Sequence, residues 1–482
     1  MSRSLKGKTI SGILWSGLDK IGYDIVQFVV ELIMARLLLP SDYGVLGILL
    51  IFSSFAQIFI DGGFTTALIQ KNDRTEEDIN TAFVYNLTTS LLIYFLIFAL
   101  SPLISSFYEN KDLTVFLRVY SLVLIISSVS SIHSTLLTIN LDFKKLSLVT
   151  IASGILSGFI GVLCAFSGLG VWSLIIQQLS MAGVRSLLLL IIVKWKLSFS
   201  YSKPSFNYLF KFGSNLIMTN ILARVYDNLY PLIIGKMYPF STLGLYTRGK
   251  QFAGLPANIF NSIFMKVTFP VLSSIKDDTM RVKNAYRKFI GMSSFFIFPS
   301  MCLLILLAKP IVLILLTERW LGAVPFIQIL CVGLMFNHIN SINLNLLYVY
   351  GRSDLAFKLE IIKKTTATII LVVSTFWGIW GICIGQAFYN VVAVTLNSLY
   401  TKKLIGISFT SQIRDFGPIW IIGILSLILT YAICMFLHDF YINMVANIIV
   451  YIIMYYGLCK ISSLRSLVLI EEIIINKIKN KK

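Results

Sequence analysis

Residues 82–100 read AFVYNLTTSLLIYFLIFAL, an apolar stretch without a charged residue that decides the fold class. As an α-helix it extends about 30 Å, which is the thickness of the hydrocarbon core of a bilayer. Comparable stretches recur along the chain, for example at 303–316 with its flanks and at 419–437. The sequence therefore predicts a membrane protein built from membrane-spanning helices.

The composition of the whole chain agrees with this stretch. Of the 482 residues, 57% are hydrophobic and only 13% are charged, too few charges to cover a soluble domain of this length. The strands of a membrane β-barrel alternate in polarity over about 10 residues, whereas these runs are continuous. We expect an all-α polytopic membrane protein of about 14 transmembrane helices. The expected spans are 10–35, 43–62, 80–102, 114–139, 145–166, 170–193, 208–236, 244–270, 284–308, 322–349, 358–378, 380–400, 416–437 and 441–461.

Positive charge is distributed unequally between alternate loops. One side would hold most of the Lys and Arg residues, including those of 276–288 and 352–364, while the other holds few, such as Arg36 and Lys111. Because basic loops stay on the cytoplasmic side, both termini are expected there. The same bias explains the net charge of +19 without a nucleic-acid partner. The start of the chain is interpreted as a retained first helix rather than a signal peptide.

The connections argue against a membrane enzyme. No expected loop exceeds about 15 residues, so a folded catalytic domain has no room on either side. The six cysteines stand singly, and no catalytic, cofactor or metal motif is present in the sequence. The predictions are therefore no catalytic residues, no cofactor and no metal. A glycan polymerase is disfavoured on the same grounds.

Two halves of the chain resemble each other weakly. Residues 37–47, LLLPSDYGVLG, and 237–246, MYPFSTLGLY, each place a proline turn and a glycine between two helices, at an offset of 199–200 residues. A later similarity links GLGVW at 168–172 with GIWG at 378–381. Unrelated proline–glycine turns are the alternative explanation.

Two lobes of six helices each explain both similarities. Because six is even, both lobes would enter the membrane from the same side, as parallel repeats about an axis along the membrane normal. Such a pair encloses a central cavity that opens to each face in turn. The expected domains are an N-lobe at 1–200, a C-lobe at 201–405, and two further helices with a basic cytoplasmic tail at 406–482.

Polar residues fall mainly on the first two helices of each expected lobe, at helical spacing. Inside a membrane such groups usually pair with one another or line a water-filled path. A cavity with Arg and Lys suits an anionic substrate, because a guanidinium grips phosphate oxygens bidentately, and buried carboxylates suit a coupling H⁺ or Na⁺. Salt bridges that only hold helices together are the alternative. The residues are Lys20, Asp24, Gln27, Glu31, Ser54, Gln57 and Asp61 in the first lobe, and Asn220, Arg224, Asp227, Asn228, Arg248, Gln251 and Lys266 in the second.

The tenth expected helix is rich in amides. They have two interpretations of equal weight, hydrogen bonds to sugar hydroxyls or hydrogen bonds that tie helices together. The polar residues of this helix are Asn337, His338, Asn340, Ser341, Asn343 and Asn345.

The run ARLLLPSDYGVLG at 35–47 resembles the hallmark of the polysaccharide-export flippases. Asp61-Gly62-Gly63, Leu245-Tyr246 and GLGVW at 168–172 fit the same family. The chain is thus similar to the Wzx-type O-antigen and polysaccharide flippases of the multidrug/oligosaccharidyl-lipid/polysaccharide (MOP) exporter superfamily. The resemblance extends over essentially the whole chain in length, helix count and repeat.

This resemblance implies a flippase that moves an undecaprenyl-diphosphate-linked oligosaccharide across the bacterial inner membrane by alternating access, for O-antigen, lipopolysaccharide, capsule or exopolysaccharide synthesis. The implied partners are that lipid-linked substrate, the bilayer, a coupling H⁺ or Na⁺ and the polysaccharide polymerase machinery. By helix position, substrate contacts are expected from Lys20, Arg224, Arg248 and Lys266 with the amides Gln57 and Asn220, and ion coupling or charge pairing from Asp24, Glu31, Asp61 and Asp227.

Two other transporters of the superfamily are alternatives. One is a flippase for lipid-linked peptidoglycan precursors, which the sequence distinguishes poorly from a polysaccharide flippase. A cation-coupled multidrug exporter should have an acidic and aromatic cavity, and Arg224 and Arg248 disfavour it.

Overall fold

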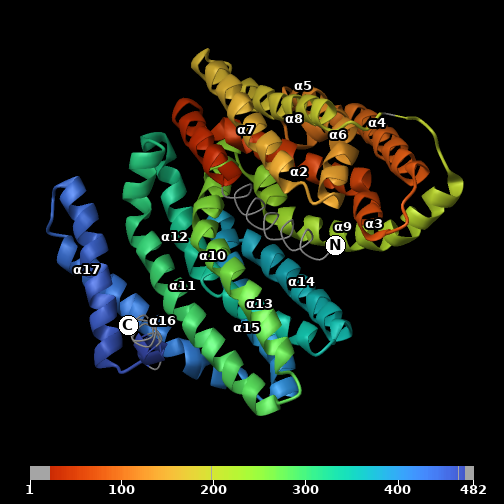
Figure 1. The fold of residues 1–482 in the computed structure, drawn as a ribbon. Helices are drawn as coiled ribbons and strands as arrows, with labels where there is room; N and C mark the ends of the chain where they lie inside the picture. Colours follow the sequence, from red (N-terminus) through yellow and green to blue (C-terminus); the bar gives the residue numbers. More distant parts are fainter. Residues whose placement is uncertain (1–21, 197, 465, 470, 473–482) are drawn as a thin grey trace, which may run out of the picture. The chain divides into compact units, whose positions relative to one another are not determined.

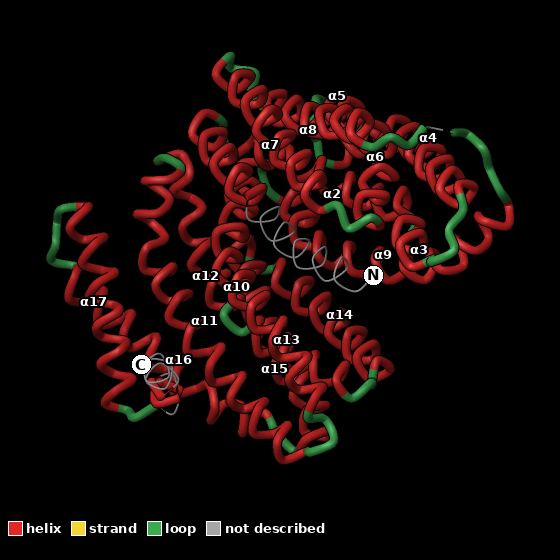
Figure 2. The backbone as a smooth tube through the Cα atoms, viewed as in Figure 1, coloured by secondary structure: helices red, strands yellow, loops and turns green. Residues whose placement is uncertain are grey.

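The computed structural model describes residues 22–196, 198–464, 466–469 and 471–472. In these ranges every regular element is a helix and no strand occurs, as Figure 2 shows. The predicted all-α fold class is confirmed. The beginning of the first expected helix, with Lys20, lies outside the described residues.

The chain divides into two compact units, 1–247 and 248–482. The boundary falls inside one helix, α10, whereas the lobes were expected to meet at 200/201; the lobe division itself stays a prediction. Unit 1 starts with a helix at 22–37. It continues with α2 (Pro40–Asp61), α3 (Phe64–Gln70), α4 (Glu76–Phe107), α5 (Leu113–Tyr120), α6 (Leu122–Ile139), α7 (Phe143–Phe166), α8 (Val171–Ile192), α9 (Lys203–Met237) and the first turns of α10 (Phe240–Ser274) (Figure 1).

Unit 2 begins with the rest of α10. It continues with α11 (Thr279–Leu315), the 3₁₀ helix η1 (Glu318–Ala323), α12 (Val324–Leu334), α13 (Asn337–Val349), α14 (Ser353–Thr375), α15 (Gly378–Ile405), α16 (Phe409–Cys434) and α17 (Phe440–Ile461).

Most expected spans coincide with helices, with two differences. The expected span 114–139 is divided at Ser121 into α5 and α6, and 322–349 is divided into α12 and α13 after a 3₁₀ turn. Ten helices of the described chain are long and apolar enough to cross a membrane by length and composition. The long helices α9, α10 and α14 are not among the ten, although each coincides with an expected span.

The helix α4 illustrates how the sequence determines these spans. Thr75 and Asp78 form a capping box that satisfies the free N–H groups at the start of the helix. Past this polar turn the helix leaves large apolar side chains uncovered, with Leu92 65% and Leu103 67% exposed. A water-soluble protein would bury such a surface, so hydrocarbon is the medium that this face fits.

One buried cluster of unit 1 forms around the short helix α3. Phe64 and Leu68 of α3 are fully buried against Phe83 of α4, Ile132 of α6 and Leu209 of α9. The sequence analysis did not anticipate α3, because its seven residues follow directly on the expected span 43–62. Its packing joins α9 to the elements that precede it in unit 1.

Candidate functional site

The helices α2 and α9 form an antiparallel pair in unit 1. Along the pair, Gly213 lies against Gly62 and Gly63, the side chains of Ser54 and Asn228 approach each other, and Gly235 lies against Ile48. Proline at the first helical turn starts α2 at Pro40, and Gly62 in the left-handed conformation (φ 50°) ends it. The pair therefore brings the expected polar stripes of α2 and α9 together.

The two backbones nearly touch at the end of α2. A Cβ atom on Gly213 would lie 1.9 Å from the carbonyl oxygen of Gly62, and one on Gly63 would lie 2.6 Å from the Cα of Gly213. Only glycine allows this approach, since any side chain would overlap the opposite backbone. The sequence analysis noted Gly62-Gly63 but missed Gly213, whose partner is 150 residues away in sequence and gives no local signal.

A matching crossing occurs at the start of α2. A Cβ atom on Gly44 would lie 1.8 Å from the carbonyl oxygen of Phe240, and one on Gly244 would lie 1.8 Å from that of Pro40. Each glycine thus meets the first residue of the other helix, in a reciprocal arrangement. These are the glycines of the two similar stretches 37–47 and 237–246, so the weak sequence repeat corresponds to a contact between its two copies.

Polar side chains occupy α2 and α9 between the two crossings. Gln57 donates to Asp61 at 2.9 Å, and Asn228 donates to Ser54 at 3.4 Å and to the carbonyl of Arg224 at 2.9 Å. Gln57 and Asp61 are half-buried. The side chains of Ser54, Gln57 and Asp61 in α2 and of Asn228 in α9 are therefore held by bonds at the interface or along their own helix.

The central turns of α9 carry a polar face that is exposed. Asn220, Arg224 and Asp227, at i, i+4 and i+7, lie on one side of the helix, and all three are exposed. Asp227 also has an interaction within the described chain. A charge in the middle of a membrane span is costly against lipid, so the exposed Arg224 is a candidate for lining a water-filled path.

In the helix 22–37 the expected acids have different surroundings. Asp24 is exposed, whereas Glu31 is half-buried and accepts a hydrogen bond from Gln27 at 3.2 Å. The backbone carbonyl of Glu31 also accepts from Tyr43 of α2 at 3.5 Å. Glu31 is thus partly tied into the packing, and Asp24 is the more accessible acid.

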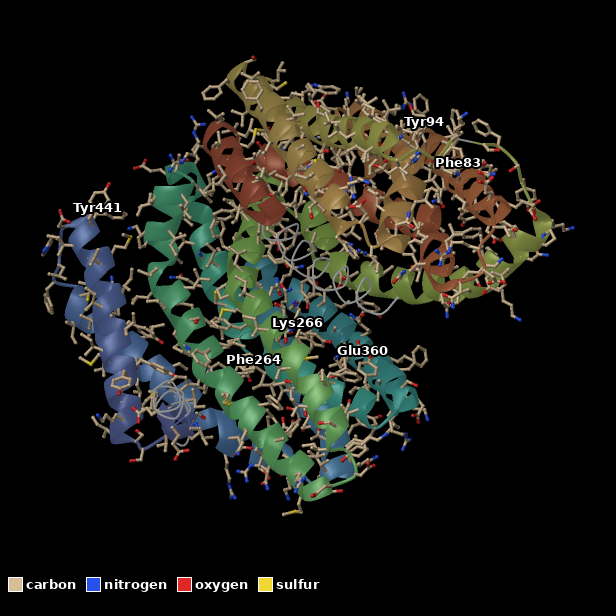
Figure 3. All side chains as sticks on the ribbon, viewed as in Figure 1. Phe83, Tyr94, Phe264, Lys266, Glu360 and Tyr441 are labelled. Atoms are coloured by element: carbon tan, nitrogen blue, oxygen red, sulfur yellow. The ribbon has the colours of Figure 1, made fainter. Side chains whose placement is uncertain are left out.

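In unit 2 the two expected cations of α10 differ. Arg248 is only 5% exposed, donates to Gln251 and lies over the Trp320 ring at 5.9 Å, contacts that fit a cation held within the protein. Lys266, labelled on α10 in Figure 3, is exposed. Of the two, Lys266 has the freedom to meet a ligand.

The amides of the tenth expected helix lie on α13 and bond to neighbouring helices. The side-chain oxygen of Asn343 accepts from Tyr286 of α11 at 2.6 Å and from Gln412 of α16 at 3.1 Å. Asn340 accepts from Asn397 of α15 at 2.7 Å. The hydroxyl of Ser294 and Nε2 of His338 form a hydrogen bond at 2.9 Å. We name this set the α13 network; its buried bonds favour the role of tying helices together.

The chain has the fold of transporters of the MOP superfamily. A lipid II flippase, MurJ, in an inward closed conformation matches with a TM-score of 0.74 over 93% of this chain and 99% of that chain, at 17% identity. An inward-facing multidrug resistance MATE family transporter of the MOP superfamily matches with a TM-score of 0.60 over 84% of this chain and 99% of that chain, at 14% identity.

Sequence comparisons identify the family within this class. Residues 33–325 match the family described as polysaccharide biosynthesis protein. The lipopolysaccharide biosynthesis protein WzxC of Escherichia coli is 26% identical over 89% of this chain and 88% of its own length. The teichuronic acid biosynthesis protein TuaB of Bacillus subtilis is 25% identical over 73% of this chain and 74% of its own. The chain belongs to the polysaccharide biosynthesis protein family, and the resemblance inferred from its sequence is confirmed.

Proposed function

We propose that this protein is a flippase that moves an undecaprenyl-diphosphate-linked oligosaccharide across the bacterial inner membrane for the synthesis of a cell-surface polysaccharide. The family match supports this role, as do relatives with names such as succinoglycan biosynthesis transport protein ExoT of Rhizobium meliloti. The observation that carries the proposal within the structure is the exposed Arg224 in the central turns of α9. A fixed guanidinium in a water-filled path suits a diphosphate.

The substrate would be held by several weak contacts rather than by one tight pocket. In unit 1, Arg224 would attract the diphosphate or acidic sugars, while Asn220 would offer its amide to sugar hydroxyls. Lys266 of unit 2 is a separate candidate cation. Asp24, Asp61 and Asp227 are the acids proposed for proton or sodium coupling, or for pairing these cations. No covalent step is part of this mechanism, so the protein would act as a transporter and not as an enzyme.

The two glycine crossings suggest how access would alternate. By the charge of the loops, the Gly44–Gly244 crossing would lie towards the periplasm and the Gly213 crossing towards the cytoplasm. Opening a path along α2 from one side requires the crossing on that side to separate. We propose that α2 moves about Pro40 and Pro239, opening one crossing while the other stays closed.

The test is the accumulation of lipid-linked oligosaccharide in a strain that lacks the gene. Wild-type protein should relieve the accumulation, whereas Arg224→Ala should not, because the diphosphate would lose its fixed cation. The matched control is Arg281→Ala, which removes a cation whose side chain is 76% exposed and which pairs with nearby Asp278. This control should complement like the wild type.

Three outcomes would redirect the proposal. Unchanged glycan intermediates after deletion would end the polysaccharide assignment and favour the multidrug exporter. An arrest of peptidoglycan synthesis would favour the peptidoglycan precursor flippase. Full complementation by Arg224→Ala would keep the transport role and remove Arg224 from the substrate path.

A further inference from the structure

Unit 2 contains a cavity that the transport site does not use. It lies between α11 and α16, which pack against each other, and the described residues Leu464, Ser466 and Leu469 that follow α17, and it has a volume of about 360 Å³. The α11 side contributes Arg287 and Lys288, and the α16 side contributes Arg414 and Asp415. Both pairs lie within the first three turns of their helices, beside the basic loops expected on the cytoplasmic side.

The charges around this cavity leave an excess of two cations. Arg287 binds Asp415 through two nitrogens, with 2.9 Å from Nε to each carboxylate oxygen, so these two charges compensate each other. In the described part of the chain, neither Lys288 nor Arg414 has a carboxylate within 4.0 Å, and both are exposed. The cavity therefore attracts an anion at its rim.

The remaining lining of the cavity combines the polar side chains of Asn284 and Ser466 with an apolar part. Pro418 and Ile419 of α16 form this apolar part together with Leu464 and Leu469. The segment that carries the two leucines is anchored by Leu467, which is 5% exposed and packs with the buried residues of α11, α16 and α17. A small hydrated anion gains nothing from the apolar part, whereas a molecule with an anionic head and an apolar body fits both the cations and the apolar part.

We propose that this cavity binds the phosphate of an anionic glycerophospholipid from the cytoplasmic leaflet. The phosphate would contact Lys288 and Arg414, and the glycerol and upper acyl chains would lie on Pro418, Leu464 and Leu469. Basic pockets between membrane helices on the cytoplasmic side recognise lipid head groups in this way. The site is independent of the proposed flippase function, because it uses none of the residues assigned to transport.

The experiment compares lipids on the purified full-length protein in detergent. Phosphatidylglycerol, phosphatidylcholine and inorganic phosphate are titrated separately, with melting temperature and native mass spectrometry as readouts. Phosphatidylglycerol should bind and stabilise, and the other two should have little effect. In Lys288→Gln/Arg414→Gln the affinity for phosphatidylglycerol should fall about tenfold or more, because two cations near the head group are lost.

A matched double variant controls for charge alone. Lys276→Gln/Arg281→Gln removes one cation from the turn before α11 and one from the first turn of α11, and this variant should bind phosphatidylglycerol like the wild type. An equal loss of phosphatidylglycerol affinity in this control would overturn the proposed site, because the lipid would then be held by the general positive charge of this face. Stabilisation by inorganic phosphate that competes with the lipid would overturn the lipid as ligand. If the first double variant does not purify folded, the single variants of these exposed residues should each weaken binding about threefold.

Discussion

Unit 1 and unit 2 both hold polar side chains on helices that coincide with expected membrane spans, but in opposite states. The α13 network of unit 2 is neutral and buried, and its central residue Asn343 bonds to three neighbouring side chains. The central polar face of α9 in unit 1 is charged and exposed, as Arg224 shows. Polar residues that look alike in sequence thus divide into those that neighbours satisfy and those that remain accessible.

This difference predicts different roles for the two sets of polar residues. A buried amide with all its partners in the protein has no capacity left for a ligand, and its removal strands those partners. An exposed charge gains little stability from its surroundings, so its replacement should cost little stability. The comparison therefore predicts large stability effects in the α13 network and functional effects on α9.

The strongest test is Asn343→Leu. It leaves the hydroxyl of Tyr286 and the amide of Gln412 buried without their shared partner. We therefore expect the free energy of unfolding to fall by about 2–4 kcal/mol. The matched change Asn228→Leu in α9, which loses a 3.4 Å bond to Ser54, should cost less than about 1 kcal/mol. Melting of the purified proteins in detergent gives both values. Equal losses in the two variants would remove the distinction between the units.

The next effect concerns the backbones of α2 and α9. Gly213→Ala places a methyl group 1.9 Å from the carbonyl oxygen of Gly62, so the helices must separate, and we expect a loss of about 1–3 kcal/mol. Gly183→Ala in α8 is the control, because no atom lies within 4 Å of the added Cβ. It should be neutral or stabilising by about 0.5–1 kcal/mol, since alanine favours the helix. The same melting assay compares the two variants. If both variants raised, or both lowered, the melting temperature, this would count against the close approach of α2 and α9.

These cases also show how far sequence reasoning reaches. Hydrophobic length predicted most of the helices, and the stretch at 35–47 identified the family, because both are local patterns. The polar stripe of α2 and α9 was also found, since helical spacing places its residues on one face. The partner of Gly62 and the bonds of Asn343 could not be found, because they depend on helices distant in sequence. Likewise, the sequence gives no sign that Arg248 and Arg224 differ. Only the structure shows that Arg248 is buried and lies over the Trp320 ring.

A smaller effect on stability is expected for Asp61→Asn. The new amide can still accept from Gln57, so stability should change by less than about 1 kcal/mol. If Asp61 carries the coupling ion, transport in proteoliposomes should lose its response to a proton or sodium gradient while residual exchange continues. Asp73→Asn, in the exposed loop after α3, should respond like the wild type. A normal gradient response in Asp61→Asn would exclude this acid from coupling.

The smallest effect is expected at the edge of unit 1, where Lys236 donates to Glu109 at 2.9 Å and to the carbonyl of Phe107 at 2.7 Å. The hydrogen bond and charge of Lys236 lower the pKa of the exposed Glu109 carboxyl. A carboxyl with a lowered folded-state pKa stabilises the protein above its unfolded pKa, and this contribution is lost as pH falls through the folded pKa. Glu109→Gln should therefore melt slightly below the wild type at pH 7, and the two should converge near pH 3 or at high salt. A difference in melting temperature that grows towards low pH would show that Glu109 acts through a contact other than its ion pair with Lys236. Exposed charges of unit 1 would then contribute substantially to stability, contrary to the contrast drawn with the α13 network.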